Sequence, residues 1–207
     1  MILLVLAPHT DDGEFGCGGT IARFVSEGHQ VHYVAFSAAE KSVDPLFPRD
    51  ILRKEVTEAT TILGIPRDNL RVLSFEVRDF PAHRQEILEE MVRLNADLKP
   101  DLVMLPSTCD THQDHQTVSL EGFRAFKKTS ILGYELAWNN LNFATNTFVI
   151  LREEHIARKA DALARYKSQA GRAYATAEYV RNLASVRGTQ IGVAYAEAFE
   201  SIRWVMR

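Results

Sequence analysis

Unbroken apolar runs recur along the 207-residue chain and alternate with longer amphipathic segments. The first run, Ile2 to Ala7, contains no polar residue, which is typical of a strand buried on both faces of a parallel sheet. Further runs that are mostly apolar predict strands at residues 31–36, 70–75, 102–105, 131–136, 147–151 and 201–205. These runs are the candidate strands of a central sheet.

Apolar residues at helical spacing fill most of the segments between these strands. They predict helices at residues 20–27, 49–63, 82–98, 113–127, 153–168 and 173–186. Residues 8–19 are polar and rich in glycine, and we expect a loop there. Strands that alternate with helices predict an α/β fold, with a Rossmann-like open, mostly parallel sheet and helices on both of its faces. We expect residues 1–207 to form one domain.

Two short segments rich in histidine and aspartate follow strands of this sheet. Residues 8–14 come directly after the first strand, and residues 110–115 come after the strand at 102–105. In the strand order 3-2-1-4-5 these two strands are neighbours, at the point where the order reverses and where such sheets bind ligands. We therefore expect the two segments to meet over one crevice.

The residue types in these segments point to a metal. A catalytic Zn²⁺ has three protein ligands and keeps one position open for water. His9, Asp12 and His115 would supply two imidazoles and one carboxylate. Non-haem iron enzymes use the same ligand types, so the residues alone leave Zn²⁺, Fe²⁺ or another divalent ion open.

Three neighbouring side chains are candidates for the chemistry. Asp11 lies beside a ligand but points elsewhere, which leaves it free to act as a base. His112 and His115 are three residues apart and share a face at a helix start, so His112 could address a substrate, while Asp114 could orient a ring nitrogen. The alternative is that the aspartates cap a helix and His112 lies at the surface; the pairing of two such segments favours the site.

Both segments resemble motifs of the LmbE/PIG-L family of zinc-dependent N-deacetylases. His9 to Asp12 is similar to the family's His-Pro-Asp-Asp, with Thr10 in place of the proline, and residues 112–115 are similar to its His-x-Asp-His. Gly13 stands where many members carry an acid. Residues 52–64, 166–169 and 195–199 resemble later parts of the family pattern, so the resemblance extends through nearly the whole chain.

The resemblance implies a zinc enzyme that removes an N-acetyl group from an N-acetylglucosamine-type amino sugar or its conjugate and releases acetate. It implies Asp11 as the general base, and His112, kept protonated by Asp114, as the donor to the oxyanion. Arg53 resembles the family's substrate-binding arginine, with a solvated helix arginine as the alternative. Trp138 to Phe143 is a candidate sugar contact or a hydrophobic lid. The relatives are often oligomers, so a homo-oligomer is also open.

The amino-acid composition argues against several classes of binding partner. The 24 Lys and Arg against 27 Asp and Glu give a net charge of −3, too small to indicate nucleic-acid binding. The two cysteines form no disulfide framework. The first apolar run is interrupted too early for a signal peptide or a membrane span. We therefore expect a cytoplasmic protein with a small-molecule substrate and neither a nucleic-acid nor a membrane partner.

Two other functions remain open from the sequence. Gly16 and Gly18 follow the first strand as in a dinucleotide-binding fingerprint, but Ile21 occupies the position of the third glycine. Asp11 and Asp12 would also repel a pyrophosphate. The remaining alternative is a family member that binds metal without catalysis, which acetate release from N-acetylated sugars would exclude.

Overall fold

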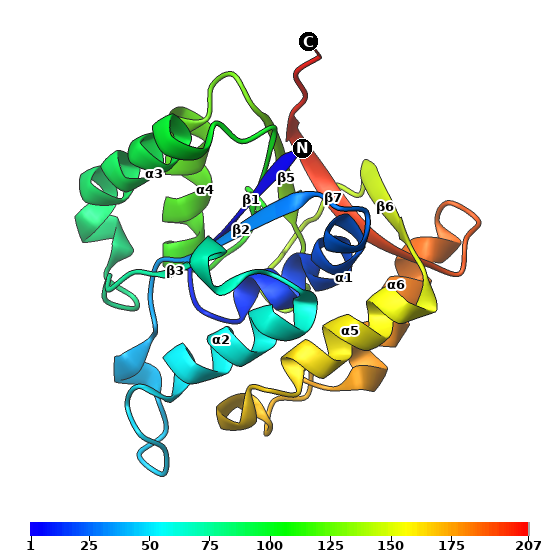
Figure 1. The fold of residues 1–207 in the computed structure, drawn as a ribbon, viewed down its shortest axis with the longest axis horizontal. Helices are drawn as coiled ribbons and strands as arrows, with labels where there is room; N and C mark the ends of the chain where they lie inside the picture. The colour runs from blue at the N-terminus through cyan, green and yellow to red at the C-terminus, as the bar shows by residue number, and fades with distance from the viewer. Residues whose placement is uncertain (207) are drawn as a thin grey trace.

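Residues 1–206 are described by a computed structural model, in which they form a seven-stranded sheet with the order β3-β2-β1-β4-β5-β7-β6 (Figure 1). The first five strands in this order are parallel, whereas β7 runs antiparallel to both β5 and β6. The strands are β1 (Ile2–Ala7), β2 (Gln30–Ala35), β3 (Leu70–Val72), β4 (Leu102–Pro106), β5 (Ser130–Tyr134), β6 (Thr147–Leu151) and β7 (Tyr195–Arg203). The predicted α/β class and the 3-2-1-4-5 order are confirmed.

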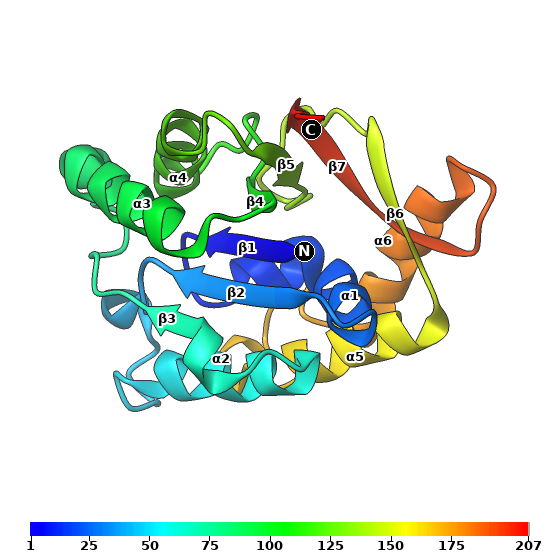
Figure 2. The ribbon, with the colours of Figure 1, turned by 45° about the horizontal axis from the view of Figure 1, so that its top comes forward.

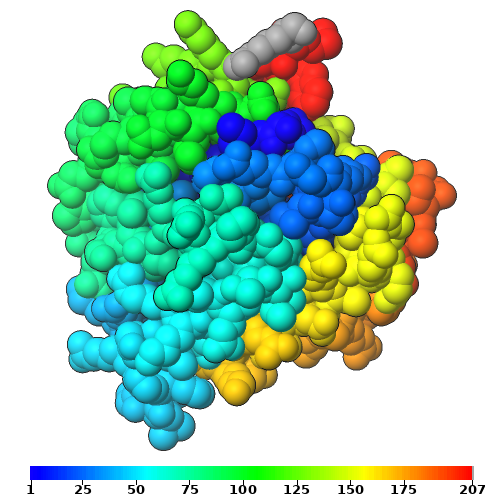
Figure 3. All heavy atoms as spheres, in the orientation of Figure 1, coloured from blue at the N-terminus to red at the C-terminus, as the bar shows by residue number. Residues whose placement is uncertain are grey.

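Helices cover both faces of the sheet, as predicted. Within residues 1–206 they are α1 (Asp12–Ser26), α2 (Ile51–Leu63), α3 (Arg84–Leu98), α4 (Gln113–Ala125), α5 (Glu153–Leu163) and α6 (Ala177–Thr189). Figure 2 shows α3 and α4 on one face and the other four on the opposite face. In Figure 3 the atoms of α2 and α5 lie against one another at the surface of the molecule. No helix in this part of the chain is long and apolar enough to cross a membrane.

Strand β1 lies at the centre of the sheet and has no polar face. Leu3, Val5 and Ala7 pack into the core beneath α1 and α2, whereas Leu4 and Leu6 pack into the core beneath α3 and α4. All five side chains are fully buried. This burial on both faces explains why the strand is an unbroken apolar run. Because β1 pairs with β4, the segments that follow these two strands come together.

The predicted loop at residues 8–19 is wrong over most of its length, because α1 already begins at Asp12. Glycine disfavours a helix, but here it allows very close packing: a Cβ on Gly13 would lie 2.5 Å from the Tyr33 ring, and one on Gly16 would lie 2.2 Å from the Tyr134 ring. The glycines therefore serve helix–sheet packing and do not form a loop around a phosphate. Only Cys17 departs from helical backbone angles within this helix.

Gly16→Ala is expected to destabilise the protein by about 1–3 kcal/mol, the usual cost of overpacking a filled core. The ring of Tyr134 cannot easily move aside, since its hydroxyl donates to the carbonyl of Leu6 at 3.0 Å. Alanine's better helix propensity offsets at most about 1 kcal/mol. Gly171→Ala is the matched control, because a Cβ there has no neighbour within 4 Å. Equal urea midpoints for Gly16→Ala and wild type would contradict this packing.

Several other boundaries differ from the prediction by a few residues. Strand β3 ends at Val72, and α3 is preceded by a 3-10 turn at Phe80–His83. Helix α5 ends at Leu163, and the last strand begins at Tyr195. Apolar residues continue into the turns that flank β3, α3 and α5, so the pattern marks the centres of these elements better than their ends. Strand β7 differs in the other direction, since it already begins before the predicted start at residue 201.

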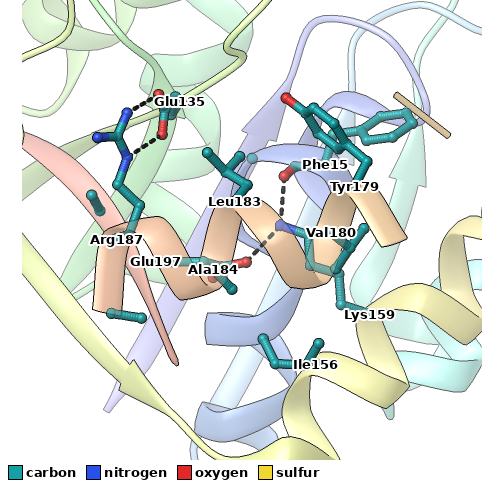
Figure 4. A pocket seen from close by; sticks show the side chains of 13 residues that line it. Phe15, Glu135, Ile156, Lys159, Tyr179, Val180, Leu183, Ala184, Arg187 and Glu197 are labelled. Carbon is teal, nitrogen blue, oxygen red and sulfur yellow. Dashed lines mark hydrogen bonds and ion pairs between the residues drawn. The ribbon is translucent and has the colours of Figure 1, made fainter. Parts of the chain in front are cut away.

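A buried ion pair between Lys159 of α5 and Glu197 of β7 also contacts α1 (Figure 4). The Nζ of Lys159 lies 2.7 Å from Glu197 Oε1 and donates to the carbonyl of Phe15 at 2.6 Å. The Glu197 carboxylate also accepts from the backbone N–H groups of Gly19 and Thr20. The adjoining cavity has a free volume of only about 20 Å³, enough for a single water. This region is therefore structural and helps to hold α1 in place.

Candidate metal centre

The segments that follow β1 and β4 meet as predicted, and three side-chain atoms converge between them. Nδ1 of His9 lies 3.1 Å from Oδ2 of Asp12, and Nε2 of His115 lies 3.2 Å from the same oxygen. The two ring nitrogens are 3.3 Å apart. His9 follows β1, Asp12 is the first residue of α1, and His115 lies in the first turn of α4.

These separations suit a single divalent ion. Ligand atoms at about 2.0–2.2 Å from a tetrahedral Zn²⁺ lie roughly 3.3–3.6 Å from one another. The three observed separations are close to that range. Asp12 and His115 are almost completely buried, with exposed fractions of 6% and 2%. The chemistry of the donors and their spacing therefore both fit a metal.

His112 is a further candidate ligand. The donor atoms of His9, His112 and His115 all lie within 4.8 Å of one another. His112 is the N-cap residue of α4, and its Nδ1 accepts a hydrogen bond from the backbone N–H of Asp114 at 3.1 Å. Only Nε2 of His112 is then left to bind a metal. Two ligand sets are therefore possible: His9 and His115 with Asp12, or His9 and His115 with His112.

The carboxylate of Asp114 contacts a different histidine from the one expected. Its Oδ2 lies 2.9 Å from Nε2 of His9 and accepts from the backbone N–H of Arg78 at 2.6 Å, while its Oδ1 accepts from that of Phe80 at 3.3 Å. Asp114 therefore orients His9. Burial and the two neighbouring histidines lower the pKa of His112 by more than the charge of Asp114 raises it. The expected role of Asp114 in keeping His112 protonated stays a prediction.

Sequence reasoning did not single out Asp110, although the structure places it at the centre. Its Oδ2 lies 2.8 Å from Nδ1 of His115, and its Oδ1 accepts from the backbone N–H of His112. Metal-binding histidines usually have such a carboxylate on the second ring nitrogen. That requirement, applied to both aspartates of the 110–115 segment, is the signal that could have identified it.

The buried charges shift several pKa values. Burial opposes protonation of His9 and His115, but Asp12 and the partner carboxylates outweigh it and raise their pKa values to about 9 and about 10. Burial also opposes ionisation of Asp12, yet the two histidines hold its pKa well below the usual range. Protonated His9 and His115 thus balance the negative charge of Asp12, and a bound metal ion would replace these protons.

Asp11 and His112 are shifted in opposite directions. Burial, followed by the charge of Asp12, raises the pKa of Asp11 to about 6. Burial and the neighbouring His115 and His9 lower the pKa of His112. At neutral pH Asp11 is therefore a carboxylate whose pKa lies close to the ambient pH, and His112 is a neutral imidazole.

A cavity of about 370 Å³ opens above this cluster. Trp138 forms part of its wall and stacks on Tyr174, with ring centroids 3.8 Å apart and planes at 10°. Phe15 packs edge-on against both rings. Trp138 therefore lines the cavity as part of an aromatic cluster, and one of its faces is covered by Tyr174. Sequence reasoning missed Tyr174, which lies outside every recognised motif.

Arg53 lies away from this cavity. Its Nε donates to Glu40 at 2.9 Å, and its Nη1 donates to the backbone carbonyl of Val72 at 3.2 Å. Its neighbour Leu52 does line the cavity, whereas Arg53 lines a separate depression beside β3. The guanidinium thus joins α2 to β3, and a substrate contact by Arg53 stays a prediction.

Known proteins share both the sequence and the fold. The family model for GlcNAc-PI de-N-acetylase, PIG-L, matches residues 4–126, which include both metal motifs. The uncharacterized deacetylase YaiS of Escherichia coli (strain K12) is 28% identical over 174 residues, 80% of this chain and 90% of that protein. The crystal structure of the conserved protein TT1542 from Thermus thermophilus has a TM-score of 0.79 and 30% identity, and covers 99% of this chain and 96% of that one.

A solved structure of a named enzyme supports the fold alone. The zinc-inhibited form of teicoplanin deacetylase Orf2 has a TM-score of 0.74 and 16% identity, over 98% of this chain and 100% of that one. The family match covers more than half of the chain and contains the residues that converge in the structure. The chain therefore belongs to the PIG-L/LmbE family of deacetylases, hydrolases that act on amide C–N bonds.

Proposed function

We propose that the chain is a zinc-dependent N-deacetylase with His9, Asp12 and His115 as its metal ligands. The observation that carries this proposal is the convergence of their three donor atoms within 3.3 Å of one another. Asp12 is favoured over His112 as the third ligand because its oxygen lies nearly equidistant from both rings. Fe²⁺ or another divalent ion would suit the same donors.

The proposed substrate is an N-acetylglucosamine-type amino sugar or a conjugate of one. The family description names such a group. A cavity of about 370 Å³ with aromatic and polar walls suits a small ligand of this size. Acetate would be the second product.

The side chains have distinct roles in this proposal. A bound Zn²⁺ would supply a Lewis acid that polarises the acetamide carbonyl and makes water more acidic. Asp11, as a carboxylate with a pKa of about 6, takes the proton of the attacking water and passes it to the leaving amine. Asp114 and Asp110 are positioning residues, which orient His9 and His115.

His112 is the proposed donor to the oxyanion of the tetrahedral intermediate, in its neutral form. Its Nδ1 accepts from the Asp114 N–H, so the ring proton of the neutral imidazole must lie on Nε2. That tautomer presents an N–H to the cavity without any need for a positive charge. Loss of such a donor typically slows turnover about 10²- to 10³-fold.

Acetate release is the experiment that tests the proposed function. Purified protein loaded with Zn²⁺ is incubated with N-acetylglucosamine, with N-acetylglucosamine conjugates and with acetylated amines that lack a sugar. The proposal predicts release from the sugar substrates and none after treatment with a chelator. Release only from the sugar-free amines would overturn the substrate assignment.

The pH dependence of kcat/KM reports the ionisation of Asp11. Because the base must be deprotonated, activity is expected to be present above the pKa of Asp11 and to fall tenfold per pH unit below it. With burial raising this pKa to about 6, the fall begins near pH 6 in place of pH 4. Initial rates between pH 4 and 8, with metal content checked at each pH, measure it. A flat profile down to pH 4.5 would contradict the assignment.

Asp110→Asn is expected to weaken zinc binding about 10- to 100-fold, as is typical when a metal-bound histidine loses its outer carboxylate. The variant keeps a side chain of similar shape beside Nδ1 of His115, so the fold should persist. Competition with a chromogenic chelator measures the affinity. Asp97→Asn, at an exposed position on α3, is the matched control. Equal affinities for Asp110→Asn and wild type would remove the positioning role.

A further inference from the structure

Arg78 has an unusual backbone conformation for an arginine. Its φ is +71°, in the left-handed region that residues other than glycine and asparagine avoid. Within the described chain, only Ala39 and Lys99 share a positive φ among residues that are not glycine. Strained backbone of this kind often marks a functional position.

The backbone at Arg78 has a clear role, but that role does not require an arginine. The N–H group donates to Oδ2 of Asp114 at 2.6 Å, and this carboxylate orients His9. A glycine would present the same N–H with no strain. This backbone hydrogen bond therefore does not account for the arginine side chain.

The side chain of Arg78 lines the cavity above the metal centre and is exposed at its mouth. Its guanidinium donates to the hydroxyl of Ser42 at 2.8 Å. Among residues 1–206, no carboxylate lies within the 4.0 Å of an ion pair with it. The mouth of the cavity thus carries the positive charge of Arg78, whose guanidinium has further N–H groups available to donate to a ligand.

A second guanidinium lines the same cavity. Arg172 belongs to the turn that precedes α6, is exposed, and donates through Nη1 to the hydroxyl of Tyr174 at 2.7 Å. Its charge reaches the catalytic centre, since it lowers the pKa of Asp11 against the larger effect of burial. No ion pair within the described chain involves Arg172 either.

We propose that Arg78 and Arg172 bind an anionic group of the substrate, a carboxylate or a phosphate, at the mouth of the metal cavity. Guanidinium groups bind both kinds of anion in a planar, often bidentate geometry. Because both side chains are exposed, the anion belongs to the part of the substrate that projects away from the acetamide. This inference rests on the proposed deacetylase function and narrows its substrate to an anionic N-acetylated conjugate.

The test compares charged and neutral substrates in the zinc-loaded, full-length protein. N-acetylglucosamine is neutral, N-acetylglucosamine 6-phosphate carries a phosphate, and N-acetylmuramic acid carries a carboxylate. The readout is the ratio of kcat/KM for each charged substrate to that for the neutral one. A charge-assisted contact predicts a ratio of roughly 10 or more in wild type, and the two charged substrates distinguish phosphate from carboxylate.

Arg78→Gly and Arg172→Gln are expected to bring this ratio close to 1. Arg78→Gly keeps the N–H to Asp114 and relieves the positive φ, so the variant should fold. Lys99→Gly is the matched control: it removes a cation at another position of positive φ, at the end of α3, and should keep the wild-type ratio. An unchanged ratio in both arginine variants would overturn the proposal.

Calorimetry separates this inference from the proposed function. Binding of glucosamine 6-phosphate and of glucosamine is measured without any turnover, in wild type and in the Arg78→Gly, Arg172→Gln double variant. If wild type binds glucosamine 6-phosphate more tightly than glucosamine and the double variant does not, the anion site is supported even if no acetate is released. Equal binding of the two ligands by wild type overturns the anion site even if neutral N-acetylglucosamine is deacetylated.

Discussion

Replacing Asp11 with asparagine is expected to lower turnover about 10²- to 10⁴-fold, the usual contribution of a general base, while the bound zinc stays unchanged. Asparagine has nearly the same shape but cannot accept the proton of the attacking water. The ligand atoms of His9, Asp12 and His115 are not altered by the change. Acetate release and metal content, measured on the same preparation, test both halves of this expectation.

Stability provides a control for this variant. The pKa of Asp11 is raised by burial, so its charged form costs folding free energy at pH values above the unfolded pKa. A neutral asparagine removes that cost, and the melting temperature at pH 7 should therefore not fall. Asp79→Asn, at an exposed position, should keep both activity and stability. Wild-type turnover in Asp11→Asn would show that another group is the base.

His115→Ala is expected to lose zinc binding and, with it, deacetylase activity. Its Nε2 is one of the three converging donors, and two remaining donors form a much weaker site. The loss should exceed the roughly 10- to 100-fold expected for the outer residue Asp110. Equilibrium dialysis followed by metal analysis measures it directly.

Two further variants separate metal loss from misfolding at this position. His115 is buried, and its removal takes one partner from each of Asp110 and Asp12, so alanine also costs stability. His115→Gln keeps a polar side chain there and should fold, yet bind zinc poorly. His83→Ala, at a partly exposed histidine outside the site, should bind zinc as wild type does. Equal zinc content in His115→Gln and wild type would remove His115 from the ligand set.

The sheet order and the meeting of the two motifs could be predicted because they depend on simple patterns. Residues 3–7 are buried on both faces of the sheet, so their apolar run is unbroken. Strands that alternate with helices restrict the sheet to few topologies. The prediction that His9, Asp12 and His115 lie close together follows from this order alone, and the structure confirms their proximity.

The start of α1 could not be predicted from local sequence. Its glycines disfavour a helix, and the rings that compensate belong to β2 and β5, far away along the chain. The carboxylate that contacts each histidine could not be predicted either, because it depends on how the side chains turn in the folded chain. Asp114 is two residues from His112, but at the start of α4 its side chain turns toward His9. Arg78 and Arg172 come from turns without a motif, so only the folded cavity brings them together.

The central claim is that one metal ion at His9, Asp12 and His115 enables deacetylation, and a titration tests it most directly. Protein stripped with a chelator is titrated with Zn²⁺, and acetate release from N-acetylglucosamine and its 6-phosphate is followed at each step. We predict no release without metal, and a linear recovery that ends at one zinc per chain. Full acetate release from the metal-free protein would contradict the account.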